Sequence, residues 1–329
     1  MNPQTTHRQL TDTVLMVKPI AFRYNEQTAV NNLYQHNPSQ LSNLTAQDKA
    51  RNEFEGLIIN LRHAGIHVIV VEDNRQTDTP DSVFPNNWIS FHDDGTVVLY
   101  PMWAPNRRLE RRQEILTALQ ENHGCLIKKV VDYSPYENEG KFLEGTGSLV
   151  LDRVHSIAYA CISPRTHPEL VQKFCDDFDY QPLIFHAYQE LGREQHEIYH
   201  TNVMMNVGEN IAVICADTIK DERERETVLH TLAKTGKEIV FLSEEQNNHF
   251  AGNMLQLAPL LSPLEGEPRG VLVMSAQAYH SLTYEQIRQI EEKTTIVYSP
   301  LDTIETYGGG SARCMMAEVF LPRCKRPSY

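Results

Sequence analysis

The sequence has no two cysteines in a CxxC arrangement and no apolar run close to the length of a membrane-spanning helix. Its cysteines stand at positions 125, 161, 175, 215, 314 and 324. Residues 1–30 also lack the basic-then-apolar pattern of a secretory signal. A disulfide framework is therefore not indicated, and a membrane helix needs about 20 apolar residues. These absences predict a reduced, cytoplasmic protein.

The sequence is also poor in positive charge. Thirty Lys and Arg residues stand against 43 Asp and Glu residues, the formal net charge is −13, and no local run of basic residues offsets it. This balance argues against nucleic acid or an anionic membrane surface as a partner. We therefore expect a small-molecule ligand, and the sequence leaves homo-oligomerisation open.

Proline-rich and low-complexity linkers are absent as well. At 329 residues the chain can form either one large α/β domain or two smaller domains. The lack of a linker favours one catalytic domain over residues 1–329. Within it, the polar residues 1–11 are interpreted as a disordered lead-in.

Strand-like and helix-like segments alternate along the chain, which is typical of α/β proteins. Strands are predicted at residues 14–17, 67–71, 89–91, 96–100, 126–131, 149–151, 157–161, 211–215, 239–242, 271–274 and 295–298. Helices are predicted at residues 45–62, with Thr45 as the cap, at 107–120, 168–178 and 220–234, and from the cap Thr283 to residue 293. This count fits five strand-and-helix units of roughly 60 to 65 residues.

Residues 308–314, Gly-Gly-Gly-Ser-Ala-Arg-Cys, form the first candidate site segment. Glycine permits positive φ angles and a close approach of the backbone to a ligand. The apolar residues that follow predict a buried strand. Arg313 next to Cys314 suits a nucleophile, because a nearby positive charge favours the reactive thiolate. An inert core cysteine behind a tight turn would give the same pattern, so this segment alone does not decide between the two.

Three further polar clusters lie where loops meet strands, which is where sites are usually found. They are residues 80–88 with Asp81, Asn86 and Asn87, residues 142–148 with Glu144, and residues 199–202 with His200 and Asn202. A plain turn would explain either of the first two clusters. A lone histidine among apolar neighbours is more often structural than catalytic.

Together these segments supply a thiol, an imidazole and a carboxylate, in Cys314, His200 and Glu144. Such a set is sufficient for nucleophilic catalysis, because the thiolate attacks carbon, the imidazole moves the proton and the carboxylate holds the imidazole. Metal binding is a rival use of Cys and His. However, no two candidate ligands have zinc-type spacing, so we expect no metal.

The combined pattern resembles a known superfamily. Residues 142–148, 163–166, 200–202 and 308–314 together are similar to the guanidine-modifying enzymes of the pentein fold, which include arginine deiminase, agmatine deiminase, dimethylarginine dimethylaminohydrolase and the amidinotransferases. Residues 80–84 and 104–108 resemble the dimethylarginine hydrolases, and the overall pattern, including residues 250–255, most resembles bacterial citrulline-utilisation hydrolases. The resemblance covers residues 14–320 and implies an α/β fold of five ββαβ-like units around a pseudo-fivefold axis, with the site at its centre.

The resemblance also implies roles for individual residues. Cys314 is similar to the family nucleophile, His200 to its acid and base, and Glu144 to the carboxylate that orients the imidazole. No cofactor is implied.

At the amino-acid end of the substrate, Arg107 and Arg165 fall where relatives hold the α-carboxylate. A planar guanidinium suits a carboxylate because it can donate two parallel hydrogen bonds. Asp81 falls where relatives line the same end of the substrate.

The reactive end differs from the arginine deiminases, which place two carboxylates against the substrate guanidinium. The matching positions here are Asn87, with Asn86 as the alternative, and Asn202. A carboxylate pairs with a cation, whereas a carboxamide offers a donor and an acceptor to a neutral ureido group. We therefore expect a cofactor-independent hydrolase that converts citrulline to ornithine, carbon dioxide and ammonia. The alternatives are an arginine dihydrolase or deiminase, a dimethylarginine hydrolase, an amidinotransferase, or a non-catalytic amino-acid binder.

Overall fold

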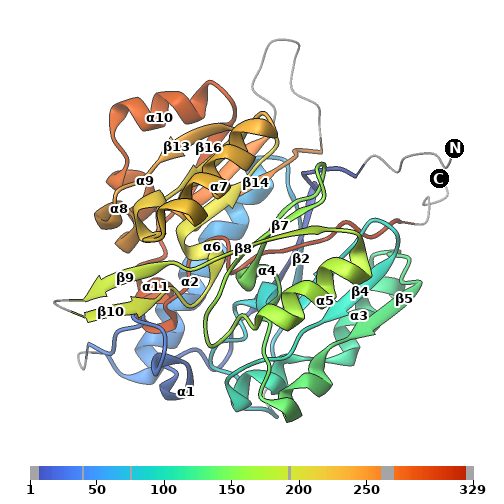
Figure 1. The fold of residues 1–329 in the computed structure, drawn as a ribbon. Coiled ribbons are helices and arrows are strands. Elements are labelled where there is room, and N and C mark those ends of the chain that lie inside the picture. The colour runs from blue at the N-terminus through green and yellow to red at the C-terminus, as the bar shows by residue number, and fades with distance from the viewer. Residues whose placement is uncertain (1–6, 39–40, 75, 192–193, 261–269, 324–329) are drawn as a thin grey trace, which may run out of the picture.

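The computed structural model describes residues 7–38, 41–74, 76–191, 194–260 and 270–323. Within these residues the strands form five three-stranded sheets and one separate hairpin (Figure 1). The sheets have the orders β17-β1-β2, β3-β4-β5, β6-β7-β8, β11-β12-β13 and β14-β15-β16, and the hairpin pairs β10 with β9.

The strands are β1 (Thr13–Lys18), β2 (His67–Glu72), β3 (Ile89–Phe91), β4 (Thr96–Leu99), β5 (Lys129–Asp132), β6 (Leu149–Asp152), β7 (Ile157–Cys161), β8 (Gln181–Phe185), β9 (Tyr188–Leu191), β10 (Glu194–Glu197), β11 (Met205–Val207), β12 (Ile211–Ile214), β13 (Glu238–Phe241), β14 (Leu255–Leu257), β15 (Val271–Ser275), β16 (Thr295–Ser299) and β17 (Ala317–Glu318). The helices are α1 (Glu26–Ala29), α2 (Asn43–His63), α3 (Gln113–Glu121), α4 (Gly145–Ser148), α5 (Pro168–Phe178), α6 (Thr201–Met204), α7 (Glu222–Lys234), α8 (Glu244–Asn248), α9 (Ala276–Ser281), α10 (Tyr284–Glu291) and α11 (Asp302–Gly308). Short 3₁₀ helices occur at η1 (Pro85–Asn87), η2 (Pro105–Glu110), η3 (Ser134–Glu139) and η4 (Ala216–Thr218).

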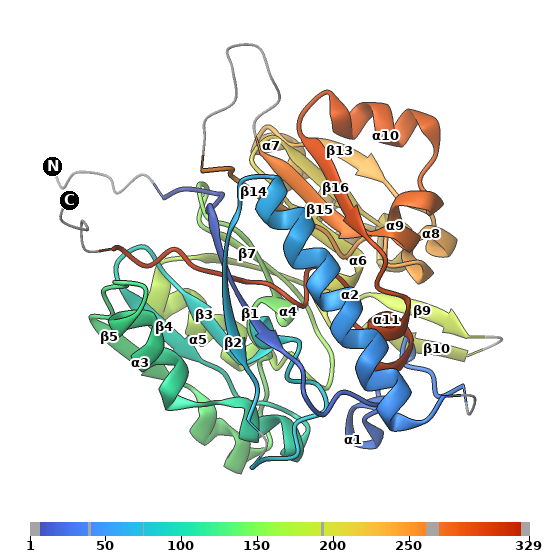
Figure 2. The ribbon, with the colours of Figure 1, turned by 180° about the vertical axis from the view of Figure 1, so that it is seen from behind.

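All five sheets repeat one pattern. In each, the middle strand is antiparallel to one neighbour and parallel to the other, and a helix connects the two parallel strands. The connecting helices α2, α3, α5, α7 and α10 lie towards the outside of the molecule, and α2 is best seen in Figure 2. Parallel strands need such a crossover connection. The α/β class and the five units predicted from the sequence are confirmed.

The first sheet joins the two ends of the chain. β17 pairs antiparallel with β1, with Val14 opposite Glu318, and β1 pairs in parallel with β2. The strand predicted after Cys314 is therefore present, but it is short. This pairing ties the segment that carries the thiol to the N-terminal strand.

The N-terminal lead-in is more ordered than predicted. Residues 1–6 lie outside the described residues, but Gln9 and Thr11 are buried. The side chain of Thr11 donates to Val319 O at 2.8 Å. The expectation of disorder is therefore wrong for residues 9–11, because their polar side chains find partners that local sequence cannot reveal.

Two helix starts also differ from the prediction. The N-cap of α2 is Ser42, whose side chain accepts from the backbone N–H of Thr45, whereas Thr45 itself was the predicted cap. The helix predicted at residues 107–120 is divided into η2 and α3, so Arg107 lies in a 3₁₀ turn and is buried. By contrast, Thr283 caps α10 in a capping box with Gln286, as predicted for the cap.

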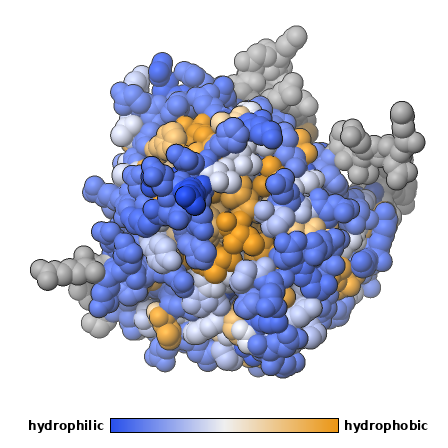
Figure 3. All heavy atoms as spheres, in the orientation of Figure 1, coloured by the Kyte–Doolittle hydropathy of each residue, from blue (hydrophilic) through white to orange (hydrophobic). Residues whose placement is uncertain are grey.

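The core is divided into clusters between neighbouring units, and one of them reaches the site. It packs α2 against strands of the first and last sheets and includes Phe84, Cys314 and Met315. On the face in Figure 3, apolar atoms gather near the middle, where β8 lies in Figure 1, and Pro182, Leu183 and Ile184 of β8 are half-buried.

None of the helices in the described ranges is long and apolar enough to cross a membrane. Cys125, Cys161, Cys175, Cys215 and Cys314 are free thiols, and Cys324 lies outside the described residues.

Candidate active site

One cavity collects most of the predicted site residues. Its lining includes Asp81, Asn87, Arg107, Arg165, His200 and Cys314, together with Thr28, Asn32, Phe84, Tyr199 and residues 308–310. The predicted residues Asn86, Glu144 and Asn202 do not line it, but each contacts a residue that does. The volume is ≈ 10 Å³, which is about the space of one water molecule. An amino-acid substrate therefore requires part of this wall to move.

The glycine segment follows the end of α11 and leads into a turn that carries Cys314. Gly309 is the C-cap, with φ 62°, and its N–H donates to Glu305 O, a left-handed conformation that glycine adopts without strain. Gly308 packs so closely on Phe84 that a Cβ atom there would lie 2.8 Å from the ring. Gly309 combines positive φ with a close approach, because a Cβ atom there would lie 2.5 Å from Asn32 Nδ2. Cys314 itself is 2% exposed.

Two carboxamides flank the thiol. Asn253 Nδ2 lies 3.3 Å from Cys314 Sγ, and Asn202 Nδ2 lies 3.6 Å from it. Asn253 is fixed in turn, because its Oδ1 accepts from the backbone N–H of Arg313 at 3.0 Å and its Nδ2 donates to Asn202 O at 2.8 Å. The thiol thus lies among neutral donors.

His200 and Glu144 form a buried pair. His200 Nε2 is 2.8 Å from Glu144 Oε2, and Glu144 Oε1 accepts from the backbone N–H of Trp103 at 2.9 Å. Burial raises the pKa of Glu144, but Arg165, the His200 hydrogen bond and Arg107 together lower it to about 2. Burial lowers the pKa of His200 to about 4, although Glu144 opposes this. At neutral pH the pair is therefore a carboxylate and a neutral imidazole, with Nδ1 left as the basic nitrogen.

The Glu-Gly-Thr-Gly sequence is explained by crowding at Gly147. A Cβ atom at this position would lie 2.5 Å from Asn87 Nδ2 and 2.8 Å from His200 Nδ1. Any other residue would displace one of these two side chains. The glycine allows the amide of Asn87 and the imidazole of His200 to approach each other.

Arg107 is already heavily bonded within the protein. Its Nε and Nη2 each donate to the Glu110 carboxylate at 2.9 Å, and Nη2 also donates to Phe84 O at 3.0 Å. Its Nη1 donates to Asn87 Oδ1 at 2.7 Å. Burial lowers the pKa of Arg107, but the Glu110 ion pair outweighs this and raises it above its ordinary value. These bonds leave one hydrogen of Nη1 for a ligand.

Arg165 is held by the segment around α1. Its Nε donates to Asn31 Oδ1 at 2.9 Å, and its Nη2 donates to Thr28 O at 2.8 Å. Its Nη1 lies 3.5 Å from Glu144 Oε2, and its guanidinium carbon lies 4.9 Å from the centre of the Tyr199 ring. Nη1 is therefore the part of this guanidinium with capacity for a ligand carboxylate.

Among the described residues that line this cavity, Asp81 is the single carboxylate. Its Oδ2 accepts from Asn25 Nδ2 at 2.7 Å and from Thr28 Oγ1 at 2.9 Å, and its Oδ1 is buried without a hydrogen-bond partner. Burial raises the pKa of Asp81, and Arg107 partly offsets this. Of the two asparagines considered at the reactive end, Asn87 lines the cavity, whereas Asn86 lies behind it and accepts from Asn87 Nδ2 at 3.0 Å.

Comparison with protein families identifies the chain. The family model described as N,N dimethylarginine dimethylhydrolase, eukaryotic, matches residues 18–321. The chain belongs to this family. Membership confirms the resemblance to the guanidine-modifying enzymes of the pentein fold. Comparison with curated proteins gave no match.

Solved structures confirm the pentein fold of this family member. The apo structure of ArgZ, an arginine dihydrolase from the ornithine-ammonia cycle in cyanobacteria, matches with a TM-score of 0.70 and 16% identity, over 95% of this chain and 41% of that one. The N-terminal domain of ArgZ bound to substrate matches at 0.69 and 15% identity, over 94% and 99% of the two chains. A dimethylarginine dimethylaminohydrolase adduct with S-methyl-L-thiocitrulline matches at 0.60 and 13% identity, also over 94% and 99%. The chain thus spans less than half of the ArgZ chain in the apo structure.

Several residues at the site were not predicted from the sequence. Asn253 contacts the thiol, Glu110 pairs with Arg107, and Asn25 and Thr28 bond to Asp81. Asn253 lies in residues 250–255, the segment that carried part of the family resemblance, so that segment was the available signal. In the part of the chain that the structure describes, no group of three or more His, Cys, Asp or Glu side chains could hold a metal ion.

Proposed function

We propose that this family member is a cofactor-independent hydrolase of the ureido group of citrulline, with ornithine, carbon dioxide and ammonia as products. The observation that carries the proposal is the chemistry around the thiol. Asn202 and Asn253 contact Cys314, and Asn87 lines the same cavity. A guanidinium buried against carboxamides alone would lack a counter-charge, whereas a neutral ureido group can hydrogen-bond to them.

In this proposal Cys314 is the nucleophile. Its proton passes to the neutral imidazole of His200 as sulfur attacks the ureido carbon, and the imidazolium then protonates the departing nitrogen. The carbon remains on sulfur as a carbamoyl group when ornithine leaves. Water, activated by His200, releases carbamate, which decomposes to carbon dioxide and ammonia. Glu144 stabilises the imidazolium through the 2.8 Å contact with Nε2.

We assign the amino-acid end to Arg165, Arg107 and Asp81. The free hydrogens on the Nη1 atoms of both arginines suit the α-carboxylate. The unpartnered Oδ1 of Asp81 suits the α-ammonium group, which would supply the missing hydrogen bond and the counter-charge. Such a pocket distinguishes amino acids from simple amines.

An arginine dihydrolase is the second candidate, favoured by the fold shared with ArgZ. The family name equally keeps methylated arginine as a candidate substrate. A deiminase or an amidinotransferase would use the same thiol and imidazole. A non-catalytic binder is disfavoured, because the three groups needed for turnover are present and two of them, His200 and Glu144, are paired.

Product analysis separates these candidates. Purified protein is incubated with citrulline, arginine or dimethylarginine, and ornithine, citrulline, ammonia and methylamines are quantified. The proposal predicts equal amounts of ornithine and ammonia from citrulline, and none from the Cys314→Ser variant, whose hydroxyl is a far weaker nucleophile. Citrulline that accumulates from arginine indicates a deiminase, and methylamine release indicates the dimethylarginine reaction. Either result without citrulline turnover contradicts the proposal.

A further inference from the structure

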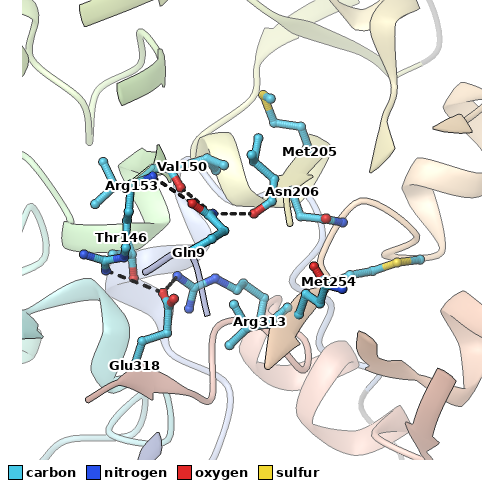
Figure 4. Close-up of a pocket in the computed structure, with 13 residues that line it drawn as sticks. Gln9, Thr146, Val150, Arg153, Met205, Asn206, Met254, Arg313 and Glu318 are labelled. Atoms are coloured by element: carbon cyan, nitrogen blue, oxygen red, sulfur yellow. Dashed lines mark hydrogen bonds and ion pairs between the residues drawn. The ribbon is translucent and has the colours of Figure 1, made fainter. Parts of the chain in front are cut away.

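A second cavity, here called the rear cavity, lies behind the thiol segment. Arg313 lines it, although the adjacent Cys314 lines the active-site cavity. Its other lining residues come from several units and include Gln9, Thr146, Arg153, Asn206 and Glu318 (Figure 4). The volume is ≈ 20 Å³, which accommodates a water molecule or a small ion.

The charged groups of the rear cavity are not balanced among themselves. Two guanidinium groups, Arg153 and Arg313, share the carboxylate of Glu318, at 3.9 Å and 2.7 Å respectively. Arg153 and Arg313 are only 5% and 6% exposed. Burial lowers the pKa of Arg313, and the neighbouring Arg153 lowers it further. Because buried charges are costly unless paired, the lining residues favour a ligand with one negative charge.

Asn206 on β11 offers this cavity a free carboxamide. The residue is 6% exposed, and both its Nδ2 and its Oδ1 are buried without a hydrogen-bond partner. Gln9 in the same wall differs, because its Nε2 donates to Leu151 O at 2.9 Å and to Val207 O at 3.0 Å, and its Oε1 accepts from Arg153 N at 2.8 Å. Buried amides are normally satisfied, so Asn206 requires a ligand that both accepts and donates.

We propose that the rear cavity binds a small monovalent oxyanion that carries one hydroxyl group, the chemistry of bicarbonate. Its negative oxygens accept from Arg153, Arg313 and Asn206 Nδ2, and its hydroxyl donates to Asn206 Oδ1. A halide or formate balances the charge but has no hydroxyl for Oδ1. The site does not depend on which substrate the active site hydrolyses.

Thermal unfolding tests the proposal. The wild-type chain is unfolded at pH 8 and constant ionic strength, while sodium gluconate, which is too large for the cavity, is replaced by bicarbonate, formate or chloride. A ligand that binds only the folded state raises Tm in a saturable way. The expected order of apparent affinity is bicarbonate first, then formate and chloride.

Variants decide whether the effect arises at this site. Asn206→Leu removes the donor and the acceptor, and Asn206→Asp places a fixed carboxylate beside the arginines, so both should weaken the bicarbonate response at least tenfold. Asn247→Leu is the matched control. Asn247 is also buried and its Oδ1 is also unpartnered, but it does not line the rear cavity. This control should lower Tm in gluconate and keep the bicarbonate response.

Two results would overturn the proposal. The first is a wild-type Tm that is the same in gluconate and in bicarbonate, which means that the cavity holds water only. The second is an equal bicarbonate response in wild type and in Asn206→Asp, which places the effect elsewhere on the protein. If Asn206→Leu does not fold, Asn206→Asp, which changes the shape least, still decides the question.

Discussion

His200 Nε2 and Glu144 Oε2 lie 2.8 Å apart, in a pair whose members are at most 1% exposed. The carboxylate fixes which ring nitrogen carries the proton, so the other nitrogen is available for catalysis. Glu144→Gln keeps the shape but removes the charge that stabilises the imidazolium. We expect kcat to fall on the order of 100-fold or more, with KM nearly unchanged. Steady-state kinetics measure both, and an unchanged kcat would exclude Glu144 from the mechanism.

The same histidine predicts how stability depends on pH. Its pKa is about 4 in the folded protein against 6.5 ordinarily, so between these values the unfolded chain binds the extra proton. The contribution of His200 to the free energy of unfolding therefore increases as pH rises from about 4 to 6.5. The increase over this range is roughly 3 kcal/mol. His200→Gln should lose this dependence.

Urea unfolding of wild type and His200→Gln at several pH values checks this. Glu305 acts in the opposite direction, because burial raises its pKa to about 7 and stability falls as pH rises through that range. Glu305 is present in both proteins, so its contribution cancels when the free energy of unfolding of one protein is subtracted from that of the other. Parallel stability curves for the two proteins below pH 6.5 would show that His200 does not titrate in this way.

The arginine clamp predicts a specific loss of substrate affinity. Arg165→Ala should raise KM for citrulline by about 10- to 100-fold, since a charge-assisted hydrogen bond contributes roughly 1.5 to 3 kcal/mol. Carbamoylated amines that lack a carboxylate should be poor substrates for wild type. Equal rates on citrulline and on such amines would show that the arginines do not bind the substrate α-carboxylate.

Arg107 requires a different design, because it is paired with Glu110 at 2.9 Å. Arg107→Ala leaves a buried carboxylate unpaired, which costs about 3 to 5 kcal/mol in stability. The double variant Arg107→Met/Glu110→Leu removes both charges, so it should recover most of the Tm but keep the high KM. Recovery of both quantities would show that Arg107 is structural only.

Asn253 is predicted to position the nucleophile. Asn253→Ala should lower kcat by about tenfold, in line with the loss of a hydrogen bond to sulfur as it gains charge during attack, and should slow alkylation of Cys314 by iodoacetamide. Asn247→Ala is the control for the loss of a buried asparagine, and it should change Tm without changing alkylation. A variant of Asn253 that is destabilised but alkylated at the wild-type rate would show a purely structural role.

The fold was largely predictable, because hydrophobic pattern and capping residues act locally. β7 and α5 have the predicted bounds, because β7 is a run of five buried residues and α5 combines an apolar face with Pro168 at its first position. The strands β8, β9, β10, β11 and β14 were missed. They are short or begin with polar residues, and β11 and β14 are defined by pairing rather than by composition.

The site was predictable only in part, for a related reason. Cys314, His200 and Glu144 were predicted from their motifs, and the fold places Cys314 and His200 in one cavity with Glu144 bonded to His200. The Glu110 partner of Arg107 and the contact of Asn253 with a thiol 61 residues away depend on tertiary packing. Neither charge nor periodicity in the sequence reports such contacts.

Selection of a neutral substrate by carboxamides is tested by kcat/KM for citrulline and for arginine in wild type and Asn87→Asp. A carboxylate beside a neutral ureido group loses water without gaining a counter-charge, whereas beside a guanidinium it is paired. We predict that wild type prefers citrulline by on the order of 100-fold or more, and that Asn87→Asp, with circular dichroism unchanged, lowers citrulline turnover and strengthens arginine binding. Wild-type enzyme that hydrolyses arginine as efficiently as citrulline would contradict the account.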